Sequence, residues 1–158
     1  MRTYLRVQWR RLFGLNLSQV TPLLFVGGQF HPSQWPQICD LGVRAVLSLQ
    51  AEYEDRFYGP PPERMLRLLV SDFHAPTLSQ FSQGVAFIAA AHDDGMPVFV
   101  HCHAGVGRAP LMAAAYLISR HGMSYRNALR HVHAARPIMA PNLRQIARLR
   151  EYEKRTYR

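Results

Sequence analysis

Residues 98–120 read VFVHCHAGVGRAPLMAAAYLISR, and this stretch decides the expected architecture. Its apolar run 98–101 predicts a buried strand, and the pattern from Leu111 to Arg120 predicts a helix that ends at Gly122. Between them lies a loop of mostly small residues that begins at a cysteine. The first turn of such a helix directs unpaired N–H groups and partial positive charge at the loop, which favours a bound anion. Because the glycines at 105 and 107 allow consecutive amides to converge on one point, the stretch predicts a phosphate-binding loop.

Cys102 and Arg108 stand at the two ends of the predicted loop. The planar guanidinium of Arg108 can bind two phosphate oxygens at once, and the positive field of the loop favours the thiolate form of Cys102. A thiolate beside a bound phosphoryl group is a nucleophile in position to attack. We therefore expect Cys102 and Arg108 to be catalytic, with a reactive sulfur that is not buried, whereas Cys39 is expected to be a buried small hydrophobic residue. The predicted phosphate-binding set is His103, Ala104, Gly105, Val106, Gly107 and Arg108.

The rest of the chain alternates short apolar runs with helical patterns. Strands are expected at Leu23–Val26, Val43–Leu49, Met65–Val70 and Val98–His101, and helices at Pro32–Leu41, Ser79–His92, Leu111–Arg120, Ser124–Ala135 and from about Asn142 to Tyr152. This alternation predicts an α/β fold with a central, mainly parallel sheet of four to five strands covered by helices. No repeat or long linker divides the chain, so we expect a single domain over residues 1–158.

The predicted chemistry also needs an acid that protonates the leaving oxygen. Asp72 follows the predicted strand Met65–Val70, and sites in parallel sheets lie beyond the carboxyl ends of the strands. Asp72 is therefore the expected general acid, and Asp55, which follows the preceding strand, is the fallback. Asp93 and Asp94 come before a strand and are expected at the opposite edge of the sheet. The candidates for contact with the leaving group are Phe73 and His74.

The first residues carry a different pattern. Residues 1–20 or so are basic and free of acidic side chains, and a helical wheel places one set of apolar residues on one side and the arginines towards the other. The apolar set is Tyr4, Leu5, Trp9, Leu12 and Phe13. Three interpretations stay open: a helix packed on the domain, a helix on a membrane surface, and a cleaved organellar presequence.

Composition bounds the class of protein. With 158 residues, of which 48% are hydrophobic and 18% charged, the chain can bury a core. Two cysteines cannot form a disulfide framework, and no apolar run approaches the ~20 residues of a membrane-spanning helix. The net charge of +9 attracts anions, so an anionic membrane surface is a candidate partner. No aromatic–basic motif indicates specific binding of nucleic acid, and a free thiol fits the cytoplasm or another reducing compartment.

A histidine and a cysteine followed, after five residues, by an arginine resemble the signature of cysteine-dependent protein tyrosine and dual-specificity phosphatases. Segments 24–28, 42–46, 136–138, 141–142 and 149–153 are similar to the same family, so the resemblance extends over most of the chain. The resemblance implies a phosphocysteine intermediate, Asp72 as general acid and no metal or other cofactor. The implied substrates are phosphotyrosine or phosphoserine/threonine proteins, or a phospholipid headgroup.

Finer features of the motif leave alternatives open. Segments 52–57 and 76–78 resemble the mitochondrial phosphatidylglycerophosphate phosphatase branch, which adds mitochondria as an alternative location. The family usually has Ser or Thr where this chain has Ala109, which implies slower hydrolysis of the intermediate. The loop and the pair Asp72-Phe73 are also similar to plant starch phosphatases, so a glucan phosphatase is one alternative. The other is a catalytically weak module that binds phosphorylated partners.

A metal site at His101-Cys102-His103 is not expected, because adjacent residues of a strand point to opposite faces.

Overall fold

The computed structural model describes residues 14–158, so the amphipathic pattern from Tyr4 to Phe13, with its three interpretations, lies outside the described part of the chain. The strands are β1 (Leu17–Thr21), β2 (Leu24–Gly27), β3 (Ala45–Gln50), β4 (Arg64–Val70) and β5 (Val98–His101). The helices are the 3-10 turn η1 (Pro32–Gln34), α2 (Trp35–Asp40), α3 (Leu78–Asp93), α4 (Arg108–His121), α5 (Tyr125–Ala135) and α6 (Leu143–Thr156).

One five-stranded sheet has the order β1-β2-β5-β3-β4. Strands β2, β5, β3 and β4 run parallel, and β1 pairs antiparallel with β2 at one edge. The prediction of a mainly parallel sheet covered by helices is confirmed. Strand β1 was not predicted, because its sequence LSQVT is short and mixed in polarity and its pairing is interrupted between Gln19 and Thr21. The amphipathic N-terminal segment was expected to extend to about residue 20. Because β1 begins at Leu17, that boundary lies too far along the chain.

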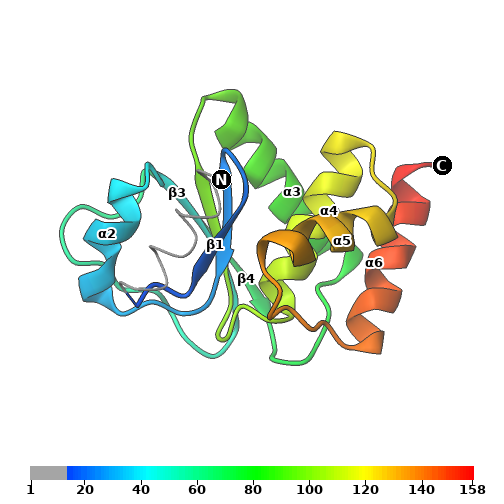
Figure 1. Ribbon diagram of the computed structural model, residues 1–158, viewed down its shortest axis with the longest axis horizontal. Coiled ribbons are helices and arrows are strands. Elements are labelled where there is room, and N and C mark those ends of the chain that lie inside the picture. The colour runs from blue at the N-terminus through cyan, green and yellow to red at the C-terminus, as the bar shows by residue number, and fades with distance from the viewer. Residues whose placement is uncertain (1–13) are drawn as a thin grey trace.

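The central strands are apolar throughout because both of their faces are covered. Along β5, Val98 and Val100 join the core beneath α3, α4, α5 and α6, whereas Phe99 joins the smaller core beneath α2. Figure 1 shows this arrangement, with α2 on one side of the sheet and the other helices on the opposite side. Edge strand β4 departs from the expectation of a buried strand, since its outer face leaves Met65 and Leu69 exposed.

The helices begin close to the expected residues, with one informative difference. Helix α4 starts at Arg108, three residues before Leu111, and Gly107 is its N-cap. Arg108 was expected at the end of the loop, but it belongs to the first turn of the helix. The helix ends at Gly122, whose left-handed backbone (φ 66°) is the glycine stop that the sequence predicts. None of the helices in residues 14–158 is long and apolar enough to cross a membrane.

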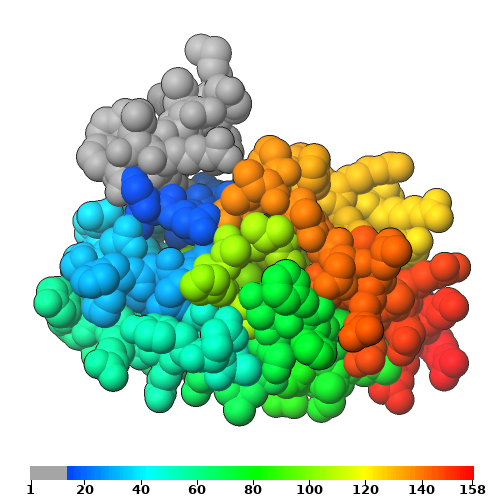
Figure 2. Space-filling view, turned by 90° about the horizontal axis from the view of Figure 1, so that it is seen from below, coloured from blue at the N-terminus to red at the C-terminus, as the bar shows by residue number. Residues whose placement is uncertain are grey.

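The parallel strands deliver their carboxyl ends to one face of the molecule. Figure 2 looks onto this face, where the yellow-green segment that follows β5 lies among teal, green and orange segments that are distant in sequence. Asp94, at the end of α3, pairs with Arg64 at the start of β4, so it lies at the opposite edge as expected. The topology thus gathers the loops after β3, β4 and β5 into one place.

His92 links α3 to the sheet by two hydrogen bonds. Its Nε2 donates to the carbonyl of Leu23 at 2.7 Å, and its Nδ1 accepts from the hydroxyl of Tyr116 at 2.9 Å. Burial lowers the pKa of His92 below its usual value, so the folded protein favours the neutral ring more than the unfolded chain does.

This pairing predicts a loss of stability in acid. The contribution of His92 is fully present above the ordinary histidine pKa of about 6.5 and is lost as the pH falls through the lower folded value. His92→Gln should flatten this dependence and cost about 1 kcal/mol through the altered hydrogen bonds. Urea unfolding across this pH range measures both effects, and the exposed His133→Gln is the matched control. A His92→Gln protein with an unchanged pH dependence would contradict the assignment.

Candidate active site

The segment from Cys102 to Gly107, here named the cysteine loop, joins β5 to α4. Every carbonyl from Cys102 to Val106 has a hydrogen-bond partner outside this loop. In a trans peptide unit the N–H points opposite to the carbonyl, so the amides of residues 103–107 turn to the inside. The partners are, in order, the His101 ring (3.3 Å), the Gln29 amide (2.7 Å), Asn16 Nδ2 (3.1 Å) with Arg136 Nη2 (3.2 Å), Arg136 Nε (2.6 Å) and the Ala140 amide (2.9 Å).

Gly105 is required by this curvature. Its φ is +71°, and a Cβ there would lie 2.4 Å from the backbone of Gly27 and 2.5 Å from Arg136 Nη2. Gly107 has a negative φ, but a Cβ would come within 2.9 Å of the Gln145 side chain. The two glycines therefore serve different needs: a left-handed backbone at the first and close approach of α6 at the second.

Cys102 lies at the floor of the loop and is 2% exposed. The expectation of an unburied sulfur is therefore wrong, because the loop and the first turn of α4 wrap around the side chain. The thiol is free, so it is not sequestered in a disulfide. A substrate can therefore contact the sulfur only through a group that is small enough to enter the loop. Cys39 is also free but exposed, since Trp35 and Ile38 of α2 face the core instead, and this corrects its assignment as a buried residue.

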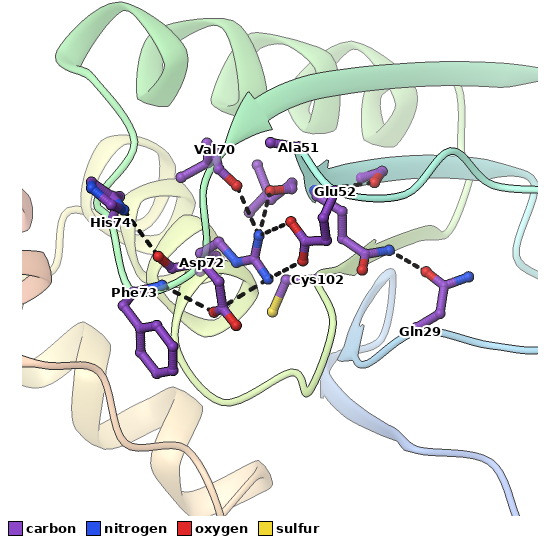
Figure 3. A network of polar contacts seen from close by, with 12 residues as sticks. Gln29, Ala51, Glu52, Val70, Asp72, Phe73, His74 and Cys102 are labelled. Atoms are coloured by element: carbon purple, nitrogen blue, oxygen red, sulfur yellow. Dashed lines mark hydrogen bonds and ion pairs between the residues drawn. The ribbon is translucent and has the colours of Figure 1, made fainter.

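Arg108 is buried, and its guanidinium is held in a fixed orientation. Nη1 donates to the carbonyl of Val70 at 2.8 Å and to Glu52 Oε2 at 2.9 Å, and Nη2 donates to Glu52 Oε1 at 2.7 Å. Figure 3 shows this two-pronged contact between the guanidinium and Glu52, with the Cys102 sulfur beside it. Nε is buried and has no protein acceptor in the described part of the chain. Nε is therefore the guanidinium donor that is left for an anion.

Glu52 is a site residue that sequence reasoning missed. The hydrogen bond from Arg108 holds the pKa of the Glu52 carboxyl below its usual range, so this group stays ionised as the partner of the arginine. For Arg108, burial alone would lower the pKa, but the hydrogen bond to Glu52 and the charges of Cys102, Glu52 and Asp72 together raise the value. A signal was available: Glu52 follows β3, the neighbour of β5, and a buried arginine needs an acceptor of opposite charge.

Glu52→Gln should lower kcat/KM on the order of 10²-fold, because the guanidinium loses the charged fork that orients it. The glutamine has nearly the same shape, so the fold should be retained. Turnover of a small aryl phosphate measures the loss. Glu54→Gln, two residues along in the same exposed loop, is the matched control. Equal activities of the two variants would contradict the assignment of Glu52.

Asp72 lies beside the arginine, at the edge of the sheet that was expected. Its Oδ1 is 3.3 Å from Arg108 Nη2, and its side chain is 51% exposed. The loop of residues 71–76 is docked onto the start of α6, since Asn142 Nδ2 donates to the Phe73 carbonyl at 2.8 Å and Gln145 Nε2 donates to that of His74 at 3.0 Å. The structure therefore brings Cys102, Arg108 and Asp72 together.

Asp55, the fallback acid, is not available for this role. Its side chain is 1% exposed and lies 2.6 Å from His101 Nε2. A carboxyl group enclosed in this way cannot reach an oxygen of a bound substrate. The geometry leaves Asp72 as the candidate acid.

A hollow of about 370 Å³ beside the cysteine loop is lined by Ala51, Glu52, Ser71, Asp72 and His103. His103 is thus exposed at the mouth. Phe73 is also exposed and has a left-handed backbone (φ 63°), which is uncommon for an aromatic residue. Figure 3 shows the Phe73 ring projecting from this loop next to Asp72. In residues 14–158 no group of three or more His, Cys, Asp or Glu is placed to hold a metal.

Asn16 and Arg136 are two further residues whose part in the site the sequence did not reveal. Arg136 is buried behind the cysteine loop, where it donates to the loop carbonyls and, at 2.5 Å, to Asn16 Oδ1. Their separation of 120 residues explains why no local pattern predicts the contact.

Comparison with known proteins agrees with this geometry. Residues 24–155 match the family model described as dual specificity phosphatase, catalytic domain. Dual specificity protein phosphatase 1-A of Xenopus laevis is 28% identical over 136 residues, which are 85% of this chain and 36% of that protein. The chain thus spans about a third of the length of the curated relatives it matches.

Two solved structures have the same fold at similar identity. PTPMT1 in complex with PI(5)P has a TM-score of 0.82 and 27% identity, and the match covers 90% of this chain and 97% of that one. A mouse putative dual specificity phosphatase complexed with zinc tungstate has a TM-score of 0.80 and 27% identity, with coverage of 89% and 87%.

Proposed function

The chain belongs to the dual specificity phosphatase family, and from this membership we propose that it hydrolyses phosphomonoesters through a phosphocysteine intermediate. One observation carries the proposal. The carbonyls from Cys102 to Val106 are all held from outside, so that the loop amides and Arg108 surround the space next to the sulfur. Such a cradle fits the three terminal oxygens of a phosphoryl group.

In the first step the Cys102 sulfur attacks phosphorus, and the bond from phosphorus to the leaving oxygen breaks. Asp72 gives its proton to that oxygen, so an alcohol or phenol departs. The amides of residues 103–107 and the free Nε–H of Arg108 stabilise the charge on the phosphoryl oxygens. Their preorganised dipoles supply the stabilisation in this mechanism, and no metal ion takes part.

In the second step a water molecule attacks the phosphocysteine. Asp72, now ionised, takes a proton from the water, the bond between phosphorus and sulfur breaks, and phosphate leaves with the thiolate restored. Ala109 is buried at the position where a hydroxyl would assist the departing thiolate, so this step is the slower one in the proposal.

The surface around the mouth favours a phospholipid headgroup over a phosphorylated protein as substrate. Phe73 is 75% exposed and Leu143 is 86% exposed, and Leu143 directly follows Asn142, whose side chain bonds the Phe73 carbonyl. Exposed apolar side chains next to the acid fit a leaving group that stays at a lipid surface. The net charge of +9 fits an anionic membrane surface. The similar PTPMT1 structure contains PI(5)P.

A module that binds phosphorylated partners without turnover is the alternative from another class. Such a module needs the cradle but not the nucleophile or the acid, whereas Cys102 and Asp72 are both in place here. The free thiol supports a reducing compartment as the site of action.

Turnover of p-nitrophenyl phosphate tests the reaction, with vanadate as inhibitor and EDTA as a check for metal independence. Hydrolysis that vanadate blocks and EDTA leaves unchanged is expected. Saturable binding of phosphate without turnover would support the binding module. A panel of a phospholipid monoester in anionic vesicles, a phosphotyrosine peptide, a phosphoserine peptide and a phosphoglucan then ranks the substrates, and we expect the lipid to have the highest kcat/KM.

A further inference from the structure

Asp55 and His101 form a buried pair that the proposed reaction does not use. His101 Nε2 lies 2.6 Å from Asp55 Oδ2, and the two side chains are 0% and 1% exposed. His101 ends β5 and Asp55 follows the neighbouring strand β3, so the pair joins two strands beside the cysteine loop. Ionisable groups are costly to bury, and buried ionisable pairs occur more often at functional sites than elsewhere.

The partner of the second ring nitrogen of His101 indicates which ring nitrogens carry a proton. Nδ1 lies 3.3 Å from the carbonyl oxygen of Cys102, which can only accept a hydrogen bond. An ionised Asp55 carboxylate is likewise only an acceptor. Both ring nitrogens therefore face acceptors, and both contacts are satisfied when each nitrogen carries a proton.

The surroundings of the ring leave few other groups to influence it. The Phe99 ring stacks on His101 with centroids 5.3 Å apart, and the Phe30 ring meets it edge-on at 5.4 Å. Asp55 and Cys102 are the ionisable residues that contact His101 in the described part of the chain.

We propose that Asp55 is a positioning residue that keeps His101 as a buried imidazolium, whose Nδ1–H holds the carbonyl of Cys102. This contact turns the next amide, that of His103, to the inside of the cysteine loop. It also places a fixed positive charge one residue from the sulfur, which favours the thiolate. The effect on turnover rests on the proposed function, but the protonation state of His101 does not.

Nitrogen NMR of the unchanged protein, labelled with ¹⁵N in histidine, tests the proposal directly. The His101 ring should show two protonated nitrogens at neutral pH, and loss of the signals in His101→Gln assigns them. In Asp55→Asn the ring should carry one proton, at Nδ1, because the asparagine amide can donate to Nε2 but has no charge. A single protonated ring nitrogen in the unchanged protein would overturn the proposal, and this readout needs no variant to fold.

Alkylation of Cys102 by iodoacetamide supplies the functional readout. In a Cys39→Ser background near pH 6, Asp55→Asn should slow the reaction about tenfold, because less of the sulfur is thiolate. Asp40→Asn makes the same change of charge on exposed α2 and should react like its parent. A folded Asp55→Asn protein with an unchanged alkylation rate would overturn the proposal. Absence of phosphatase turnover would sink the proposed function but leave both measurements interpretable.

Discussion

Cys102→Ser should reduce kcat by on the order of 10⁴-fold or more, because the chemical step loses its nucleophile. A serine hydroxyl is far less acidic than a thiol, so at neutral pH the variant presents a protonated, weak nucleophile in place of a thiolate. The bulk of the side chain hardly changes, and the floor of the cysteine loop should stay packed. Steady-state hydrolysis of p-nitrophenyl phosphate measures the loss, and rapid mixing should show that the burst of nitrophenol has disappeared.

The same variant should still bind oxyanions. The loop amides and Arg108 form the cradle, and neither depends on the sulfur, so calorimetry should detect tungstate binding to Cys102→Ser. Cys39→Ser, which alters the other free cysteine on exposed α2, should keep full activity. Retention of turnover in Cys102→Ser would exclude a phosphocysteine intermediate.

Asp72→Asn should cost about 10²–10⁴ in kcat/KM for substrates with poor leaving groups. Asparagine preserves the shape of the side chain and can still accept the amide of Phe73, which bonds Oδ1 at 3.0 Å, but it has no proton to give a departing alkoxide. Substrates whose leaving oxygen is stable as an anion do not need that proton. The loss should therefore be small for a nitrophenyl ester and large for an alkyl phosphate.

A series of aryl and alkyl phosphates with graded leaving-group acidity measures this difference. The rates of the unchanged enzyme should depend only weakly on the acidity of the leaving group. The rates of the variant should depend on it steeply. Asp94→Asn at the opposite edge of the sheet is the matched control. A uniform decrease for all esters would indicate that Asp72 acts on Arg108 rather than as an acid.

The site was predictable where its residues are neighbours in sequence or ends of adjacent strands. The strand, loop and helix of residues 98–120 follow from periodicity and from a glycine stop. The place of Asp72 follows from topology, because a residue that comes directly after a parallel strand must emerge at the carboxyl edge. Neither inference required knowledge of any side-chain contact.

The partners that fix the site were not predictable in this way. Glu52 reaches Arg108 across 56 positions, and Arg136 holds Gly105 across 31. The burial of Cys102 and the pairing of Asp55 likewise depend on which side chains converge around the loop. In sequence both Asp72 and its fallback Asp55 follow strands, yet Asp55 is enclosed against His101 and Asp72 stays half exposed.

The sequence alone determined that this protein places a cysteine, a turn rich in glycine and an arginine at the start of a helix on a parallel sheet. Local backbone preferences and the alternation of apolar runs are sufficient for that. Only the tertiary structure decided which carboxylate orients the arginine, which is enclosed and which is left beside the cradle as a candidate acid. Ion pairing and burial depend on distances between segments that meet only when the chain folds.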